Sequence, residues 1–185
     1  MKPGLILVDI QNDYFEKGSM ELVRMDRAAE NAKTILTAFR KAKLPLFHIQ
    51  HKAIQPSATF FLPDTPGVEI HESVRPLPGE TVVVKHFPNS FRETGLLDHL
   101  NKAEVEDVVI CGAMSHMCID ATTRAAFDLG FHCLVAEDAC ATRALSHNGQ
   151  IIEAENVHGA FMAALSSAYA GVISSKECLK QAALW

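Results

Sequence analysis

The 185-residue sequence has no apolar run near the roughly 18 residues that a membrane-spanning helix needs. Pro3, Asp9 and the early charges interrupt its first residues, so it also lacks the apolar core of a secretory signal peptide. We therefore expect a cytoplasmic protein without a membrane partner. Lys and Arg total 17 against 22 Asp and Glu, which gives a net charge of −5. This balance disfavours binding to nucleic acid.

The sequence also lacks any Cys-x-x-Cys pair. It has five cysteines, an odd number: Cys111, Cys118, Cys133, Cys140 and Cys178. In a chain without an export signal, these features argue against a disulfide framework and against a four-thiolate zinc site. They leave open whether one cysteine is a reactive thiol.

Short apolar runs alternate with helical patterns along the chain. The expected strands are residues 5–10, 46–50, 81–85, 108–111, 131–136 and 171–173. The expected helices are residues 26–43, 94–101, 115–129, 148–166 and 174–183. The strand runs are nearly continuous rather than alternating, which is typical of strands buried on both faces. The alternation predicts an α/β domain spanning residues 1–185, with a mostly parallel sheet and helices on both of its faces.

Three residues whose side chains could take part in catalysis fall at or just beyond the ends of expected strands. Asp9 lies near the end of the first run, Lys85 ends the third, and Cys118 follows the fourth within the first helical turn. Ligands of open parallel sheets bind beyond these carboxyl ends. A helix N-terminus and a nearby ammonium both lower a thiol pKa, so we expect an acidified Cys118. Taken singly, Asp9 could hold loop amides, Lys85 could reach solvent and Cys118 could be a core residue.

Five segments together resemble one known family, the isochorismatase-like cysteine hydrolases related to nicotinamidases and N-carbamoylsarcosine amidases. They read LILVDIQNDYF, VVVKHFPNSF, TGLLDHL, VVICGAMSHMCIDATTRAAFDLGF and VAEDACATR. The resemblance extends from about residue 4 to about residue 170. It implies a three-layer αβα sandwich, Rossmann-like, around a mostly parallel six-stranded sheet. It also implies that Asp9, Lys85 and Cys118 form a catalytic triad.

In the mechanism that the resemblance implies, Asp9 takes the thiol proton, Lys85 stabilises the thiolate, and Cys118 attacks a carbonyl carbon to form a thioester. The family has a cis peptide bond before the nucleophile, which would fall between Ala113 and Met114 here. The N–H groups of Met114 and Cys118 would then face the oxyanion.

The family contains different chemistries, and the residues favour one of them. Because Cys118 is present, we expect hydrolysis of a small amide, ureido or related C–N bond rather than of an isochorismate-type vinyl ether. The zinc-dependent nicotinamidases carry an Asp-x-His motif after the second strand, where this chain has only His48 and His51. Three residues apart on a strand, they would face opposite sides. We therefore expect neither a metal nor another cofactor.

Two non-catalytic alternatives remain. A nucleotide- or flavin-binding module would need a glycine-rich first turn, and none occurs before Gly18. The second alternative is a family member that has lost its activity and serves as a binding protein.

Aromatic residues on the loops are candidates for binding a small-molecule substrate. We expect Phe15, Phe60 and Phe91 to surround the site, with His116 either lining the pocket or capping the turn in solvent. Phe60 and Phe61 belong to residues 52–80, a long stretch that holds five of the eight prolines. These two rings could instead form a subunit interface, because relatives in the family form dimers or larger homo-oligomers.

Overall fold

The framework of the computed structural model, which describes residues 2–182, is a six-stranded sheet. Its strands are β1 (Pro3–Val8), β2 (Leu46–His51), β3 (Thr81–Lys85), β4 (Asp107–Ala113), β5 (His132–Ala141) and β8 (Gly171–Ile173). They lie in the order β3-β2-β1-β4-β5-β8, and every neighbouring pair runs parallel. The predicted parallel sheet is therefore confirmed.

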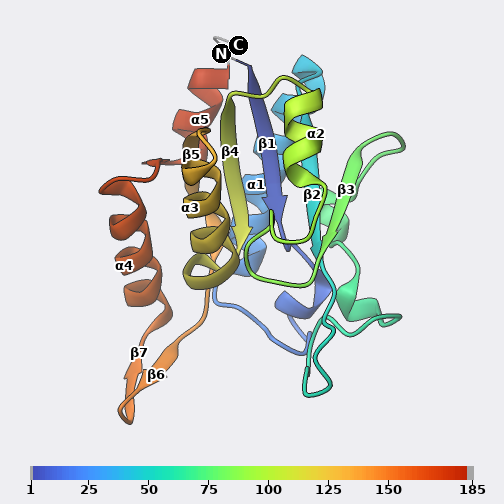
Figure 1. The fold of residues 1–185 in the computed structure, drawn as a ribbon. Coiled ribbons are helices and arrows are strands. Elements are labelled where there is room, and N and C mark those ends of the chain that lie inside the picture. Colours follow the sequence, from blue (N-terminus) through green and yellow to red (C-terminus); the bar gives the residue numbers. More distant parts are fainter. Residues whose placement is uncertain (1, 183–185) are drawn as a thin grey trace.

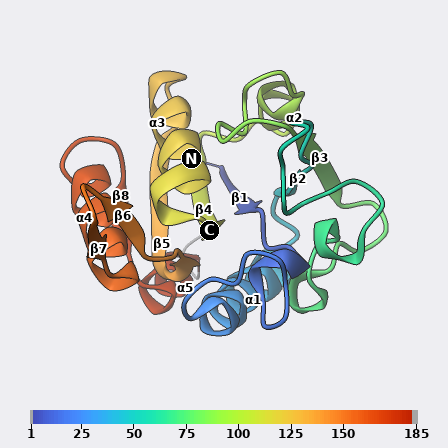
Figure 2. The same cartoon turned by 90° about the horizontal axis from the view of Figure 1, so that it is seen from below.

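Helices cover both faces of this sheet. Helices α1 (Met25–Ala42) and α5 (Ser175–Ala182) lie on one face, and α2 (Leu96–Lys102) and α3 (Asp120–Asp128) lie on the other (Figures 1 and 2). Helix α4 (Ala154–Ser166) packs beside α3. Short helical turns are η1 (Asn12–Tyr14), η2 (Pro66–Val68), η3 (Glu72–Val74) and η4 (Ser115–Ile119). The three-layer α/β fold agrees with the prediction. Within residues 2–182, no helix is long and apolar enough to cross a membrane.

The apolar patterns of the sequence account for the core. All six residues of β1 are buried, because β1 lies inside the sheet with helices on either side. Helix α1 buries one stripe at helical spacing, which includes Ala28, Ala32, Ile35, Leu36 and Phe39. The stripe packs on the sheet while the polar residues of α1 face solvent.

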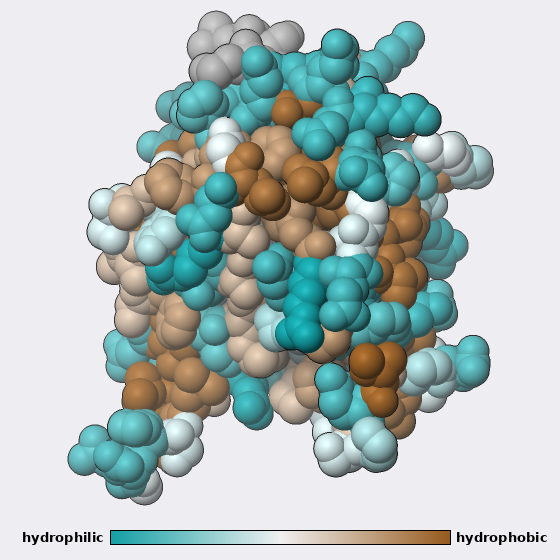
Figure 3. Space-filling model, viewed as in Figure 1, coloured by the Kyte–Doolittle hydropathy of each residue, from teal (hydrophilic) through white to brown (hydrophobic). Residues whose placement is uncertain are grey.

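One predicted helix starts too early. Residues 148–152 do not join α4; they belong to a hairpin of β6 (Leu145–His147) and β7 (Gln150–Ile152), and Glu153 is the N-cap of α4. Asn148 and Gly149 both have positive φ, 50° and 75°, as a tight two-residue hairpin turn requires. The Asn-Gly pair was the sequence signal for this turn. The hairpin projects from the body as a lobe with a polar tip (Figure 3).

The strand order places a topological switch at β1. The chain passes from β1 to β2 on one side, whereas β4 pairs with β1 on the other side. In such sheets the crevice beyond the carboxyl ends at the switch is the usual ligand site. Figure 2 looks onto this edge, from below the arrowheads of Figure 1. Asp9 directly follows β1, and the turn that follows β4 leads to Cys118.

Gly112 allows β4 to pass closely beside β1 at this edge. Its φ is 123°, and a Cβ atom there would collide with the backbone carbonyl of Val8, its partner in the β1–β4 ladder. The sheet register shifts at the same point, between Ile110 and Gly112. Only glycine fits both the torsion angle and the contact.

We expect Gly112→Ala to lower the free energy of unfolding by at least about 2 kcal/mol, because backbone strain and a backbone collision add together. Gly130→Ala is the matched control, since Gly130 has φ 93° and nothing within 4 Å of an added Cβ. That variant should lose about 1 kcal/mol. Urea denaturation measures both, and equal losses would contradict the proposed collision.

Candidate active site

The side chains of Asp9, Lys85 and Cys118 meet at the carboxyl edge of the sheet. Lys85 Nζ lies 2.7 Å from Asp9 Oδ2 and donates a hydrogen bond to Cys118 Sγ at 3.3 Å. All three side chains are buried. Residues from three distant segments, predicted from the sequence as a triad, are thus in direct contact.

The backbone of Asp9 is fixed on both sides. Its φ of 51° lies in the left-handed region, which aspartate tolerates better than most residues. The Asp9 N–H donates to the carbonyl of Ile49 at 3.1 Å, and the Asp9 carbonyl accepts from the N–H of Gln11 at 2.9 Å. The carboxylate is therefore held in place by the turn that ends β1.

Cys118 lies in the π-helical turn η4 rather than in α3, which begins at Asp120. The expected helix over residues 115–129 is therefore two elements. The peptide bond between Ala113 and Met114 is cis, at the position that the family resemblance implied. The carbonyl of Met114 accepts hydrogen bonds from the N–H groups of Met117 and Ile119, at 3.0 and 3.2 Å. These bonds hold the turn that carries the thiol.

The expectation of an acidified thiol is not met. Burial raises the pKa of the Cys118 thiol to about 12, and Asp9 acts in the same direction. Lys85 opposes both but does not outweigh them. The sequence indicated a helix terminus and an ammonium, which both lower the pKa of a thiol. It could not show the desolvation that raises this pKa by disfavouring the thiolate. At neutral pH the resting side chain is therefore a thiol.

Lys85 remains a cation although it is buried. Burial alone lowers the pKa of a lysine, but the charges of Asp9 and Cys118 and their hydrogen bonds raise the pKa of Lys85 above its usual value. The site thus holds a permanent positive charge beside a carboxylate and a thiol.

His51 also contacts Lys85, which the sequence reasoning missed. The Nδ1 atom of His51 lies 2.8 Å from Lys85 Nζ, and the side chain is half-buried. His48 faces the other side of the sheet and pairs with Glu80 at 3.0 Å, so the two histidines point to opposite faces as predicted. Strand register is what could have indicated this contact. His51 is the last residue of β2 and is paired with Lys85, the last residue of β3.

One set of ligand atoms could hold a metal ion. The donor atoms of Asp9, His51 and Cys118 all lie within 4.8 Å of one another. A carboxylate, an imidazole and a thiolate would suit zinc. However, Lys85 Nζ contacts all three residues, so its ammonium takes the central place that a cation would need.

Aromatic rings form a wall beside the triad. Phe61 contacts Tyr14 at a ring-centroid distance of 4.6 Å, Phe60 at 5.0 Å and His51 at 5.8 Å. The charges of Cys118 and Asp9 add to burial in raising the pKa of Tyr14. Phe60 and Tyr14 both belong to this wall, and Tyr14 was not among the residues expected from the sequence.

The other predicted binding residues lie apart from this wall. Phe15 is buried and stacks on His71 at 3.6 Å. Phe91 stacks on Phe131, which directly precedes β5 at the opposite edge of the sheet.

His116 is half-buried rather than a solvated cap. Its Nδ1 lies 2.6 Å from Thr142 Oγ1, and its ring meets the edge of Phe161 of α4 at 6.0 Å. These contacts fix the ring next to the η4 turn.

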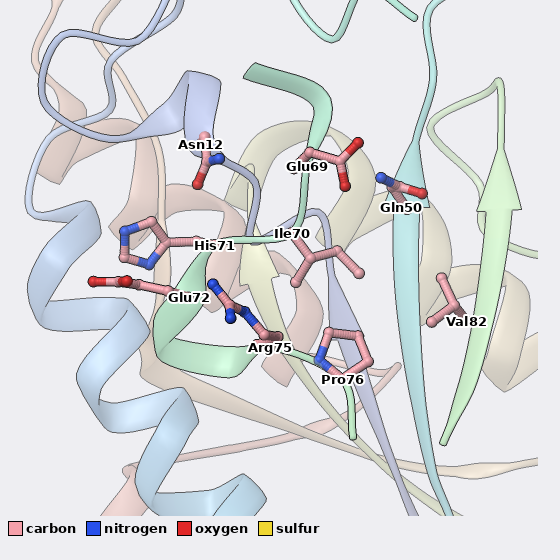
Figure 4. Close-up of a pocket in the computed structure, with 9 residues that line it drawn as sticks. All are labelled: Asn12, Gln50, Glu69, Ile70, His71, Glu72, Arg75, Pro76 and Val82. Carbon is pink, nitrogen blue, oxygen red and sulfur yellow. The ribbon is translucent and has the colours of Figure 1, made fainter. Parts of the chain in front are cut away.

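A cavity of about 600 Å³ lies elsewhere. Figure 4 shows its nine lining residues: Asn12, Gln50, Glu69, Ile70, His71, Glu72, Arg75, Pro76 and Val82. Successive residues of a strand point to opposite faces of the sheet. Gln50 is next to His51 on β2, and Val82 is three residues before Lys85 on β3, so the two cavity residues face away from the triad. The cavity therefore does not belong to the triad.

Comparisons with known proteins identify the family of this chain. Residues 3–177 match the family model of the isochorismatase domain. The chain is 52% identical to YddQ, an isochorismatase family protein of Bacillus subtilis, over 97% of this chain and all of that protein. Its sequence is 48% identical to that of an isochorismatase hydrolase from Oleispira antarctica. The two structures have a TM-score of 0.93, over 97% of this chain and 96% of that one.

More distant relatives include amidohydrolases. The chain is 35% identical to a streptothricin hydrolase of Streptomyces noursei, over 75% of this chain and 49% of that protein. It is 26% identical to the ureidoacrylate amidohydrolase RutB of Cronobacter sakazakii, over 74% of this chain and 73% of that protein. The family model matches nearly the whole chain, and the fold agrees with that of the solved relative. This chain therefore belongs to the isochorismatase family of hydrolases.

Proposed function

We propose that this hydrolase is a metal-independent cysteine amidohydrolase that cleaves a small amide, ureido or related C–N bond through a thioester. One observation carries the proposal: a single buried ammonium contacts both a carboxylate and a thiol, at 2.7 and 3.3 Å. Packing alone does not account for a buried cation between these two groups. Asp9, Lys85 and Cys118 would be the catalytic residues.

In the first step, Asp9 removes the proton from Cys118 as Sγ attacks the substrate carbonyl carbon. Ligand atoms of Asp9 and Cys118 lie within 4.8 Å of each other, so the proton has a short path. A thiol with a pKa of about 12 is not ionised in advance, which is why a general base is needed. Lys85 stabilises the negative charge while it lies on sulfur.

The tetrahedral intermediate carries its charge on the former carbonyl oxygen. The backbone N–H groups of Met114 and Cys118 would donate to this oxyanion. Loss of one such donor typically costs about 2.7–4 kcal/mol of transition-state stabilisation.

The intermediate then collapses and the C–N bond breaks. Asp9 returns its proton to the leaving nitrogen, and the acyl group stays on Cys118 as a thioester. Water attacks the thioester carbon, Asp9 takes a proton from that water, and the C–S bond breaks to release the carboxylic or carbamic acid. The cysteine regains its proton, so the cycle closes.

The aromatic wall supports a small substrate. Asp13 Oδ2 accepts the N–H of Phe61 at 2.6 Å, which ties the long loop to the turn after β1. Phe61 is buried within one chain, a location that favours the pocket over a subunit interface for its ring. The name of the ureidoacrylate amidohydrolase supports an amide-like substrate for this chain.

Replacing the proposed nucleophile tests the mechanism. We expect Cys118→Ala to abolish ammonia release from a panel of small amides and ureido compounds, because no thioester can form. Cys133→Ala is the control, since Cys133 is buried in β5 away from the triad. Full ammonia release by Cys118→Ala would exclude covalent catalysis through this thiol.

Removing metal tests the cofactor part of the proposal. We expect dialysis against EDTA to leave turnover unchanged, because Lys85 supplies the positive charge that a metal would otherwise provide. Inactivation by EDTA with rescue by Zn²⁺ would instead assign Asp9, His51 and Cys118 as zinc ligands.

We also propose that the chain forms homo-oligomers. Ile151 and Ile152 of the projecting hairpin are exposed, Ile151 to 71%. An isolated two-stranded ribbon is only marginally stable in water, so contact with a second copy would stabilise it. Light scattering on the purified protein should give the mass of a dimer or larger assembly, and a monomer mass would contradict this.

A further inference from the structure

Lys85 has a third partner besides the acid and the thiol. An ammonium group has three N–H donors and no acceptor. Its three neighbours are Asp9 Oδ2 at 2.7 Å, His51 Nδ1 at 2.8 Å and Cys118 Sγ at 3.3 Å. Each neighbour offers one acceptor atom within 3.3 Å of the buried ammonium, and His51 supplies the one whose charge does not change in the proposed reaction.

This contact determines the protonation state of His51. Nδ1 can accept from an ammonium only when it carries no proton, so the neutral ring must hold its proton on Nε2. Burial, followed by the charge of Lys85, lowers the pKa of His51 to about 4. His86 acts in the same direction and Asp9 opposes it. The imidazole is therefore a neutral acceptor at neutral pH.

The side chain of Gln11 holds His51 by both of its backbone polar groups. Gln11 Oε1 accepts the N–H of His51 at 2.7 Å, and Gln11 Nε2 donates to the His51 carbonyl at 2.9 Å. Gln11 follows Asp9 by two residues and donates its own N–H to the Asp9 carbonyl. The turn that positions the proposed base therefore also positions His51. On the ring side, Phe61 packs against the imidazole at 5.8 Å.

We propose that His51 is a positioning residue for the reaction: as a neutral acceptor, it holds the Lys85 ammonium between Asp9 and Cys118. This inference rests on the proposed function, in which Lys85 stabilises the thiolate. His51 acts through Lys85 and does not itself exchange a proton. Without His51, one N–H of a buried ammonium loses its partner, and the cation is no longer fixed towards the sulfur.

Asn and Leu have side chains of nearly the same size and shape, but only Asn has a hydrogen-bond acceptor. Comparing the two substitutions therefore separates the effect of the acceptor from the effect of losing the ring. In His51→Asn, Oδ1 is bonded to Cγ as Nδ1 is in histidine, so an acceptor remains near Lys85 Nζ. His51→Leu places a methyl group there. His48→Gln is the control on the same strand, because it keeps a hydrogen-bonding group near Glu80 on the opposite face of the sheet.

The rate constant for alkylation of Cys118 by iodoacetamide, followed from pH 7 to 10 by peptide mapping, reports the thiolate without any substrate. We expect His51→Leu to slow alkylation at a given pH about 10- to 100-fold, the usual effect of losing a hydrogen bond to a charged group. The profile should move to higher pH. His51→Asn should stay within about threefold of the wild type, and His48→Gln should match it. Lys85→Met gives the limit without any ammonium.

Wild-type rates in His51→Leu would overturn the proposal. Equal slowing in His51→Leu and His51→Asn would assign the effect to the ring rather than to its acceptor, and would also overturn it. If His51→Leu fails the urea test of folding, His51→Ala takes its place. Turnover of an amide, where found, should show the loss in kcat rather than in KM. An absence of any amide turnover would count against the proposed function alone, because alkylation does not depend on it.

Discussion

A buried ammonium between a carboxylate and a thiol is the constraint on which this structure depends. Removing one partner of a buried ion pair typically costs about 3–5 kcal/mol, because the remaining charge is left uncompensated. Asp9 and Lys85 therefore require each other, and they come from the ends of β1 and β3 with β2 between them. The register of three strands must be maintained to keep this contact. In this way one electrostatic requirement links the sheet to the site.

The same burial sets the reactivity of the thiol. With a pKa of about 12, Cys118 is protonated in the free enzyme, so proton transfer to Asp9 has to accompany the proposed attack. Such a thiol reacts little with other electrophiles in water. The ammonium gains its importance when charge appears on sulfur and then on the substrate oxygen, because electrostatic interactions are stronger away from water.

The segment that joins β2 to β3 replaces the usual crossover helix. It carries the short turns η2 and η3 and places Phe60 and Phe61 beside the triad. Asp13 and Gln11, both in the turn after β1, hold this segment and the end of β2 through hydrogen bonds. The turn after β1 thus organises the proposed base, the aromatic wall and His51 together.

The sequence by itself determined the α/β class, the parallel sheet and the three residues that meet in the site, since apolar runs and family motifs are local patterns. It also contained the Asn148-Gly149 turn, which was read as helix because neighbouring residues have helical spacing. Only the tertiary structure decided that His51 contacts Lys85, that Tyr14 joins the wall, and that burial raises the pKa of Cys118. Strand register and desolvation arise from residues far apart in the chain, so no local pattern encodes them.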